Sequence, residues 1–162
     1  MGGDGRYGAA VTIYLVRHAH AGSRSAWKGD NDRRPLSAKG WGQAEAIAGR
    51  LEGEPVARIL SSPARRCVET AEPLAKALGV EVEQLDELHE GADPDEVIDL
   101  LFGPVGDDTV VVSHGDIIPK VIRRLAAAGM RTKDANISQK GSVWALEIVD
   151  GRCVRGRYHP PG

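Results

Sequence analysis

The sequence has few cysteines and no long hydrophobic run, and both absences limit what the protein can be. The two cysteines among its 162 residues, Cys67 and Cys153, belong to no paired-cysteine motif, which favours a reducing compartment over a disulfide-linked secreted fold. No apolar run reaches the length of a membrane span, and the start MGGDGRYGAA has neither the basic nor the hydrophobic part of a signal peptide. We therefore expect a soluble, cytoplasmic protein that does not bind a membrane.

An excess of charge of one sign is also absent. The 21 Lys and Arg residues nearly balance the 23 Asp and Glu residues, so the formal net charge is −2. Nothing in this total suggests a nucleic acid as partner. Any cationic site must therefore be formed locally, by residues that the fold brings together.

The hydrophobic content is sufficient for one globular domain. Hydrophobic residues make up 41% of the chain, which is enough to bury a core at this length. No internal repeat or low-complexity tract divides the sequence. We predict a single domain over residues 1–162, with residues 1–9 flexible.

Short β-branched runs alternate with amphipathic segments, a pattern typical of an α/β fold with a mostly parallel sheet. Strands are predicted at residues 11–16, 56–60, 80–85 and 109–112, and a hairpin at 142–149 and 153–158. Helices are predicted to start after Ser37, at Ser62-Pro63, at Asp93-Pro94 and at Ile117. The expected architecture is a three-layer α/β/α sandwich with helices on both faces of the sheet.

Polar groups of catalytic type follow the predicted strands directly. They are Arg17-His18 after the first strand, Ser61-Ser62 after the second, Glu87 after the third and Ser113-His114-Gly115 after the fourth. The carboxyl ends of parallel strands meet at one edge of a sheet, where ligands bind. We therefore expect four segments that are far apart in the sequence to form one site.

These residue types suit a phosphate group and a nucleophile. Arg17 and Arg66 have planar guanidinium groups that match phosphoryl oxygens, and the helices predicted near Ser62 and Gly115 would direct backbone N–H groups toward the same region. One histidine can attack phosphorus while the other, when protonated, stabilises the charge of the transition state. Glu87 can act as the proton donor.

Residues 21–34 form a long polar segment without a regular pattern. Loops of this length are often functional, although a plain surface loop would look the same. The segment contains a basic cluster of Arg24, Lys28, Arg33 and Arg34. This cluster is either a solvated face or a substrate-binding rim, in which Arg34 would contact the substrate.

Four motifs, taken in order, carry a resemblance to a known family. They are Leu15-Val16-Arg17-His18-Ala19; Arg34-Pro35-Leu36-Ser37 with Gly40 and Gln43-Ala44; Ser61-Ser62-Pro63 with Arg66 and Glu69-Thr70; and Val112-Ser113-His114-Gly115. With them, residues 11–158 resemble the histidine phosphatase (phosphoglycerate mutase-like) superfamily. Within it the chain is most similar to the short bacterial phosphohistidine phosphatases and to the phosphatase half of certain Nudix-linked proteins.

The resemblance implies a phosphoglycerate mutase-like fold and a covalent mechanism that needs no metal or other cofactor. His18 would be the phosphorylated nucleophile, with Arg17, Arg66 and His114 as phosphate ligands. The family's acid lies in a Glu-x-His-x-Gly segment in many members, so Glu87 is the first candidate and Glu90 the alternative. Ser62, Gly115 and Arg34 complete the expected substrate-binding set. Ala19 departs from the family's usual Arg-His-Gly motif.

The expected activity is hydrolysis of a phosphomonoester or of phosphohistidine, with a phosphorylated small molecule or a phosphohistidine protein as substrate. Phosphoryl transfer of the phosphoglycerate mutase type is one alternative, against which the short chain argues. A weakly catalytic protein that binds a phosphorylated ligand is another. His18 and His20 also make a His-x-His pair that could bind zinc, but two neighbouring arginines disfavour a cation. The sequence does not indicate an oligomeric state.

Overall fold

A computed structural model of the chain describes residues 11–103 and 108–162, and the predicted flexibility of residues 1–9 lies outside these ranges. A six-stranded sheet in the order β3-β2-β4-β1-β5-β6 forms the middle layer. Four strands run parallel to one another: β3 (Val82–Gln84), β2 (Arg58–Ser61), β4 (Thr109–Ser113) and β1 (Val11–Arg17). Two more continue the sheet antiparallel beyond β1: β5 (Val143–Val149) and β6 (Arg152–His159).

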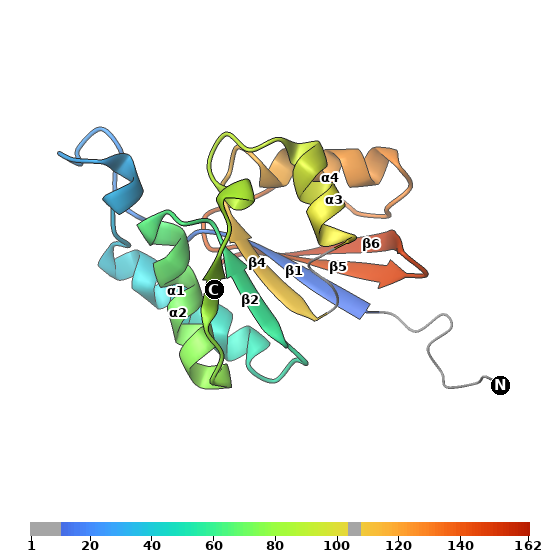
Figure 1. Cartoon of the computed structure of the whole chain (residues 1–162), viewed down its shortest axis with the longest axis horizontal. Coiled ribbons are helices and arrows are strands. Elements are labelled where there is room, and N and C mark those ends of the chain that lie inside the picture. The colour runs from blue at the N-terminus through green and yellow to red at the C-terminus, as the bar shows by residue number, and fades with distance from the viewer. Residues whose placement is uncertain (1–10, 104–107) are drawn as a thin grey trace.

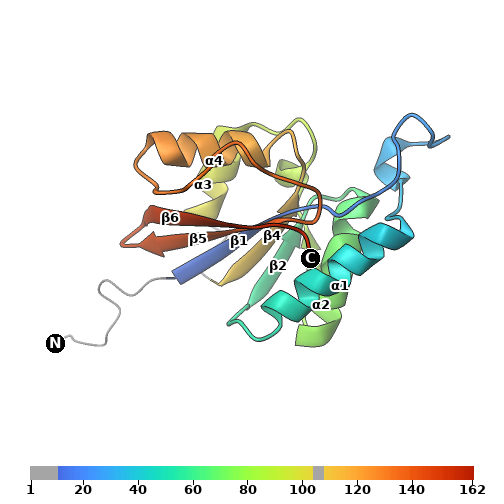
Figure 2. The same ribbon diagram turned by 180° about the vertical axis from the view of Figure 1, so that it is seen from behind.

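Helices cover both faces of this sheet (Figures 1 and 2). One face carries α1 (Ala38–Leu51) and α2 (Arg65–Leu78), and the other carries α3 (Pro94–Leu101) and α4 (Ile118–Ala127). Two short 3-10 turns, η1 (Asn31–Arg33) and η2 (Asp86–Leu88), lie in the connections. The three-layer α/β/α sandwich predicted from the sequence is confirmed.

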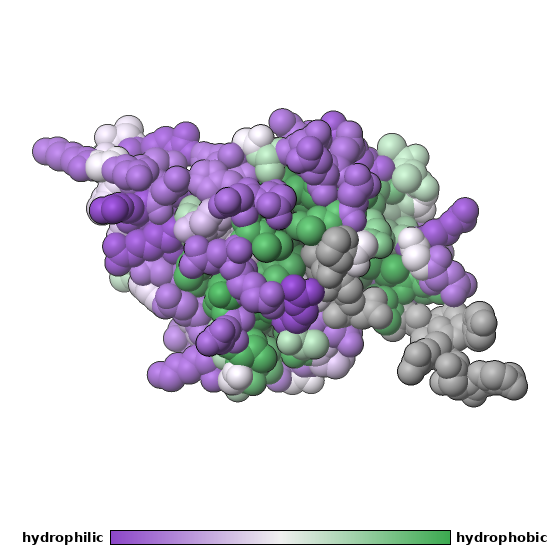
Figure 3. Space-filling model, in the orientation of Figure 1, coloured by the Kyte–Doolittle hydropathy of each residue, from purple (hydrophilic) through white to green (hydrophobic). Residues whose placement is uncertain are grey.

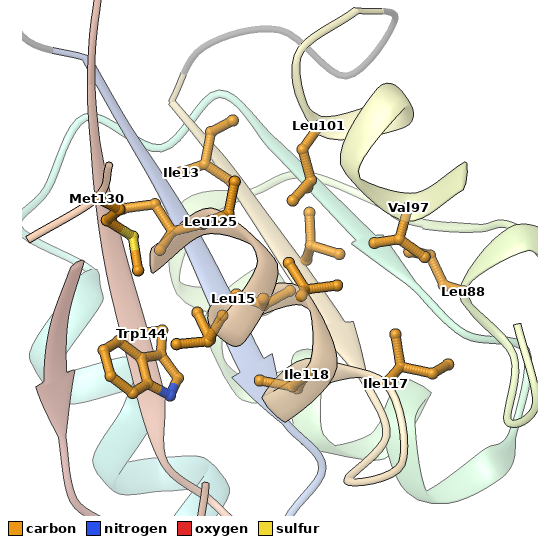
Figure 4. Close-up of a cluster of buried hydrophobic side chains, with 14 of the residues drawn as sticks. Ile13, Leu15, Leu88, Val97, Leu101, Ile117, Ile118, Leu125, Met130 and Trp144 are labelled. Atoms are coloured by element: carbon orange, nitrogen blue, oxygen red, sulfur yellow. The ribbon is translucent and has the colours of Figure 1, made fainter. Parts of the chain in front are cut away.

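Two hydrophobic clusters fill the spaces between the sheet and its helices. Along β1, Ile13 and Leu15 join the cluster under α3 and α4, whereas Tyr14 and Val16 join the cluster under α1 and α2. This division follows from the two-residue period of a strand, which places successive side chains on opposite faces. Figure 4 shows the first cluster, in which Trp144 lies close to Leu15 and Ile118. Burial on both faces explains why the central strands read as unbroken apolar runs.

Local signals place most element ends correctly. Ser37 caps α1 through a hydrogen bond from Gly40 N, and Gly79 ends α2 with a φ of 70°. Asp150 and Gly151 have φ values of 52° and 75°, as the predicted hairpin turn requires. No helix in the described ranges is long and apolar enough to cross a membrane.

The predicted start of α2 is wrong. Ser62 is not its N-cap and Pro63 is not its first residue, because the helix begins at Arg65 after Ala64, without a side-chain cap. The Ser62 hydroxyl instead lies 2.8 Å from His114 Nε2. The same hydroxyl also accepts from Ala64 N at 3.3 Å, so Ser62 joins the turn before α2 to His114.

Residues 21–34 form a projecting segment beyond the carboxyl ends of the parallel strands (Figure 1). Figure 3 shows mainly hydrophilic side chains over this end of the molecule. Arg34 is the one charged residue of the segment that is buried, and it donates to the carbonyl of Ala21 and to Asn31 Oδ1. Arg34 therefore does not lie on a solvated face, and its hydrogen bonds hold this segment together. Its predicted contact with a substrate stays a prediction.

Candidate active site

The candidate site lies at the carboxyl ends of three neighbouring strands, β2, β4 and β1. Arg17 at the end of β1 is in register with Ser113 at the end of β4, so His18 and His114 emerge side by side. Their ring centroids are 5.5 Å apart. On the other side of β4, Ser62 follows β2 and donates its backbone N–H to the Val112 carbonyl. The predicted convergence of strand ends thus brings these groups together.

His18 has one ring nitrogen that is free for chemistry. Its Nδ1 lies 2.8 Å from the carbonyl oxygen of Ala19, which can only accept, so Nδ1 carries the proton and Nε2 keeps its lone pair. Burial lowers the pKa of His18 to about 3, assisted by the nearby charges of Arg66 and Arg17 and opposed by the Ala19 carbonyl. The ring is therefore a neutral nucleophile at physiological pH.

His114 is also buried and neutral in this arrangement. Arg66 Nη2 donates weakly to its Nδ1 at 3.5 Å, which leaves Nε2 to donate to the Ser62 hydroxyl at 2.8 Å. Burial, followed by the charge of Arg66, lowers the pKa of His114 to about 4. The charge-stabilising role that the sequence suggests for a protonated His114 would therefore require an anion that raises this pKa.

Two guanidinium groups are held rigidly and are incompletely satisfied. Arg66 is fully buried and donates from Nη1 to the Asn31 carbonyl at 2.8 Å, while Arg17 Nη1 donates to the Ser138 carbonyl at 2.5 Å. Arg17 Nε and Arg66 Nε are both buried and have no partner among the described residues. Buried donors without partners are rare, and phosphoryl oxygens are suitable acceptors for them.

Gly115 gives Arg17 the room it occupies. A Cβ at this position would lie 2.4 Å from Arg17 Cζ, so the guanidinium packs directly on the backbone. Ala19, by contrast, fits where the family motif has glycine: it is buried, and its N–H donates to Thr70 Oγ1 at 2.9 Å. The substitution at Ala19 therefore leaves the turn after β1 tied to α2.

The two candidate acids differ in their surroundings. Glu90 contacts Arg66 Nη2 at 3.2 Å and also pairs with Arg24. Burial alone would raise the pKa of Glu90, but the two arginines outweigh it and lower that pKa. Glu87 is exposed and forms no ion pair within the described residues. Its turn is held beside His114, because Ser113 Oγ donates to the neighbouring Leu88 carbonyl at 2.8 Å.

Sequence reasoning missed how residues 21–34 attach to the site. Besides the Asn31 carbonyl on Arg66 and the Arg24–Glu90 pair, Asp32 Oδ1 lies 3.1 Å from His89 Nε2. It also missed Ser138 and the turn after it, where Gly141 N donates to the carbonyl oxygens of Arg17 and His18. Neither segment has a regular sequence pattern. Only the basic residues of the 21–34 segment indicated that it could belong to the site.

His20 lies apart from the groups described above, with its Nδ1 2.7 Å from Ser37 Oγ. Across the described residues, no group of three or more His, Cys, Asp or Glu side chains is arranged to hold a metal ion.

Known proteins with similar structures share this architecture. A structure of the protein histidine phosphatase SixA complexed with tungstate has a TM-score of 0.74 and 21% sequence identity, covering 92% of this chain and 94% of that one. The putative phosphohistidine phosphatase SixA from Nakamurella multipartitia has a TM-score of 0.72 and 24% identity, covering 94% of this chain and 97% of the other. At these identities the likeness establishes the fold.

Two curated sequence relatives match different shares of the chain. The 8-oxo-(d)GTP phosphatase of Mycolicibacterium smegmatis is 32% identical over 155 residues, which are 93% of this chain and 48% of that protein. A probable phosphoglycerate mutase GpmB of Serratia proteamaculans is 35% identical over 96 residues, 56% of this chain and 44% of that protein. The chain thus spans about half the length of the curated relatives it matches. The family model for the histidine phosphatase superfamily (branch 1) matches residues 13–93, and the chain belongs to that superfamily.

Proposed function

We propose that this protein is a metal-independent phosphatase that works through a phosphohistidine formed on His18. The observation that carries the proposal is the state of the His18 ring, whose Nδ1 is held by the Ala19 carbonyl and whose low pKa leaves Nε2 unprotonated. Arg17 and Arg66 lie beside it with buried, unpaired Nε donors. A nucleophile next to unsatisfied cationic donors is the arrangement that phosphoryl transfer requires.

The reaction takes two displacements at phosphorus. His18 Nε2 forms a bond to phosphorus while the bond to the leaving oxygen breaks, and that oxygen takes a proton from an acid. Water then attacks the phosphohistidine, gives up a proton to the same carboxylate and releases phosphate and free His18. Arg17 and Arg66 bind the non-bridging oxygens in both steps, and His114 shares their charge once an anion raises its pKa.

We assign the acid to Glu87 rather than to Glu90. Two arginines pair with Glu90 and lower its pKa, so it takes up a proton less readily than a carboxyl without such partners. Glu87 is unpaired within the described residues, and its turn is fixed beside His114 through Leu88. Glu90 instead contributes by holding Arg66 and the 21–34 segment.

Substrates of this activity are phosphorylated small molecules or phosphohistidine proteins. The similarity to an 8-oxo-(d)GTP phosphatase over 93% of the chain supports a small phosphate compound, and the SixA-like fold is compatible with a phosphohistidine. We place the reaction in the cytoplasm, because Cys67 and Cys153 are both free thiols. The similarity to a probable phosphoglycerate mutase makes phosphoryl transfer to an acceptor other than water the second candidate.

Trapping the intermediate tests the proposal. The chain is incubated with p-nitrophenyl phosphate, quenched in alkali and examined by mass spectrometry for phosphohistidine, with release of inorganic phosphate measured in parallel. His18→Ala is expected to abolish the phosphoenzyme and to lower phosphate release by about 10³-fold or more. His20→Ala is the matched control, because this histidine lies two positions away and bonds to Ser37.

Unchanged phosphate release by His18→Ala would overturn the mechanism. Phosphate binding without turnover in the wild-type chain would identify a binding protein instead. The mutase alternative predicts that an added phosphoglycerate accepts the phosphoryl group faster than water does.

A further inference from the structure

The turn at residues 138–142 is a second structural element built against the nucleophile. Its carbonyl at Ser138 accepts from Arg17 Nη1 at 2.5 Å, and Gly141 N donates to the carbonyl oxygens of Arg17 and His18 at 3.2 and 3.1 Å. Ser142 closes the turn on itself, donating to the Gln139 carbonyl through its backbone N–H at 3.0 Å. Lys140, at the centre of this turn, is therefore fixed next to His18 by backbone contacts.

Gly141 allows this close approach. Its φ is +80°, and a Cβ there would lie 3.0 Å from the Gln43 side chain. Gln43 itself accepts from His20 N at 2.8 Å, so the turn packs against the residues that follow the nucleophile. The conformation of the turn and its neighbours leave little freedom in where Lys140 is attached.

The site holds more positive charge than one phosphoryl group needs. Arg17 and Arg66 with His114 suffice for the group that His18 attacks. Arg34 lies nearby, and its described hydrogen bonds go to the neutral oxygens of Asn31, Ala21 and Gly22. In the described ranges, neither Arg34 nor Lys140 forms an ion pair with a carboxylate.

The pKa of Lys140 is lowered by its burial and by the positive charge around the site. Burial and then the charges of Arg17, Arg34 and Arg66 lower its pKa, as expected for a cation held close to other cations. The buried hydroxyl of Ser138 also has no hydrogen-bond partner among the described residues. A partly buried cation without a carboxylate partner and an unpaired buried hydroxyl on the same turn suit an anionic, oxygen-rich ligand.

We propose that Lys140 and Ser138 form a second anion subsite beside the phosphoryl site, and that the preferred substrate is a phosphoric anhydride carrying a second phosphate next to the one transferred. This inference rests on the proposed function of His18. His18 Nε2 bonds to the terminal phosphorus, the bond from that phosphorus to the bridging oxygen breaks, and its electron pair stays on that oxygen. The oxygen stays with the leaving group, which is phosphate from pyrophosphate and a nucleoside monophosphate from a nucleoside diphosphate, and Lys140 stabilises its charge as it leaves.

The choice of a second phosphate follows from the position of the turn. Ser138 contacts the same guanidinium that binds the transferred group, so the subsite is adjacent to the phosphoryl site rather than remote from it. A group that is both adjacent and anionic is what an anhydride supplies. Inorganic pyrophosphate and a nucleoside diphosphate share this chemistry, and they are separated by experiment.

The test compares kcat/KM for ADP, pyrophosphate, AMP and p-nitrophenyl phosphate in the wild-type chain and in Lys140→Gln. We expect kcat/KM of the variant to fall about 10- to 100-fold with a diphosphate. With the monophosphates it should fall only about 2- to 3-fold, because they lose the general attraction of the Lys140 charge but no direct contact with it. Lys140→Arg should restore most of the diphosphate activity. Lys76→Gln is the matched control, because Lys76 is exposed in the last turn of α2, at the end of the sheet opposite to the site.

Equal losses on monophosphates and diphosphates, or no loss on either, would overturn the subsite. The faster of the two diphosphates identifies the source of the anhydride. Phosphohistidine trapped on His18 by wild-type chain and by Lys140→Gln alike keeps the proposed function separate from this result. Its absence from the wild-type chain with every substrate would instead reject the function itself.

Discussion

At the scale of single residues, the orientation of the His18 ring decides what the site can do. A carbonyl on Nδ1 fixes the tautomer, and burial keeps the ring neutral, so the nucleophile needs no activating base. His114 shares this neutral state and gains its proton only with an anion nearby.

The charge states of these two rings can be measured directly. We expect NMR titration to find His18 and His114 neutral down to about pH 5, because their pKa values lie at about 3 and about 4. Adding tungstate or phosphate should raise the pKa of His114. A titration of either ring near pH 6.5 in the free protein would contradict this.

The assignment of the acid predicts a dependence on the leaving group. Glu87→Gln should lower kcat by about 10²- to 10³-fold for alkyl phosphates, whose leaving oxygen needs a proton, and much less for p-nitrophenyl phosphate. Glu90→Gln serves as the matched control and should affect both substrates alike. If the variants behave the other way round, Glu90 is the acid.

The sequence predicted the position of the candidate site residues better than the position of their surroundings. His18, Arg17, Arg66 and His114 could be predicted because each follows a strand or stands at a fixed distance from one. The turn that carries Ser138 and Lys140 could not be predicted, since it contacts Arg17 and His18 through the Ser138 carbonyl and Gly141 N, in an irregular segment. Which of Glu87 and Glu90 pairs with arginine depended on a loop conformation that no local pattern encodes.

At the scale of elements, helix α1 packs closely against the backbone that follows His18. A Cβ on Gly40 in α1 would lie 1.9 Å from the His20 carbonyl oxygen, which also accepts from Ser37 N at 3.0 Å. The backbone of α1 thus touches the chain two residues beyond His18. Glycine is required there for close packing and not for an unusual φ.

This contact predicts different outcomes for two glycines of one helix. Gly40→Ala should lower the free energy of unfolding by about 1–3 kcal/mol and reduce kcat, because α1 must move away from residues 19–21. Gly42→Ala, where no atom lies within 4 Å, should stabilise the protein by about 0.5–1 kcal/mol through helix propensity. Urea unfolding measures both changes, and equal effects would refute the close-packing explanation.

Element ends could be predicted wherever a local signal acted alone. Asp93-Pro94 starts α3 and Asp150-Gly151 makes the hairpin turn, as the sequence indicates. The start of α2 could not be predicted, because Ser62 bonds to His114 instead of capping its own helix. The third strand is shorter than predicted, since β3 is an edge strand that pairs only with residues 59–61 of the four-residue strand β2.

At the scale of the whole molecule, the fold buries two histidines that ionise readily once unfolded. The alternation of strands and helices was enough to predict the sandwich, because both faces of the sheet must be covered. The same burial links the stability of the protein to pH. In the folded state both pKa values are depressed from 6.5, to about 3 and about 4.

The sign of that linkage is fixed by the depressed values. Both histidines contribute their full stabilisation above about pH 6.5, and it is lost as the pH falls to about 4 for His114 and about 3 for His18, because the unfolded chain takes up protons first. Each adds a slope of up to about 1.4 kcal/mol per pH unit in this window. Urea unfolding at several pH values should give a smaller slope for His18→Asn than for the wild-type chain. Identical slopes would contradict the prediction.

The contact between Glu90 and Arg66 also bears on product release. Inorganic phosphate left after hydrolysis must compete with this carboxylate for the same guanidinium, so the empty site has its own internal competitor. We expect inorganic phosphate to inhibit the Glu90→Gln variant more strongly than the wild-type chain, with an inhibition constant about 10-fold lower. The Glu90 carboxylate would thereby keep the enzyme turning over when its product accumulates.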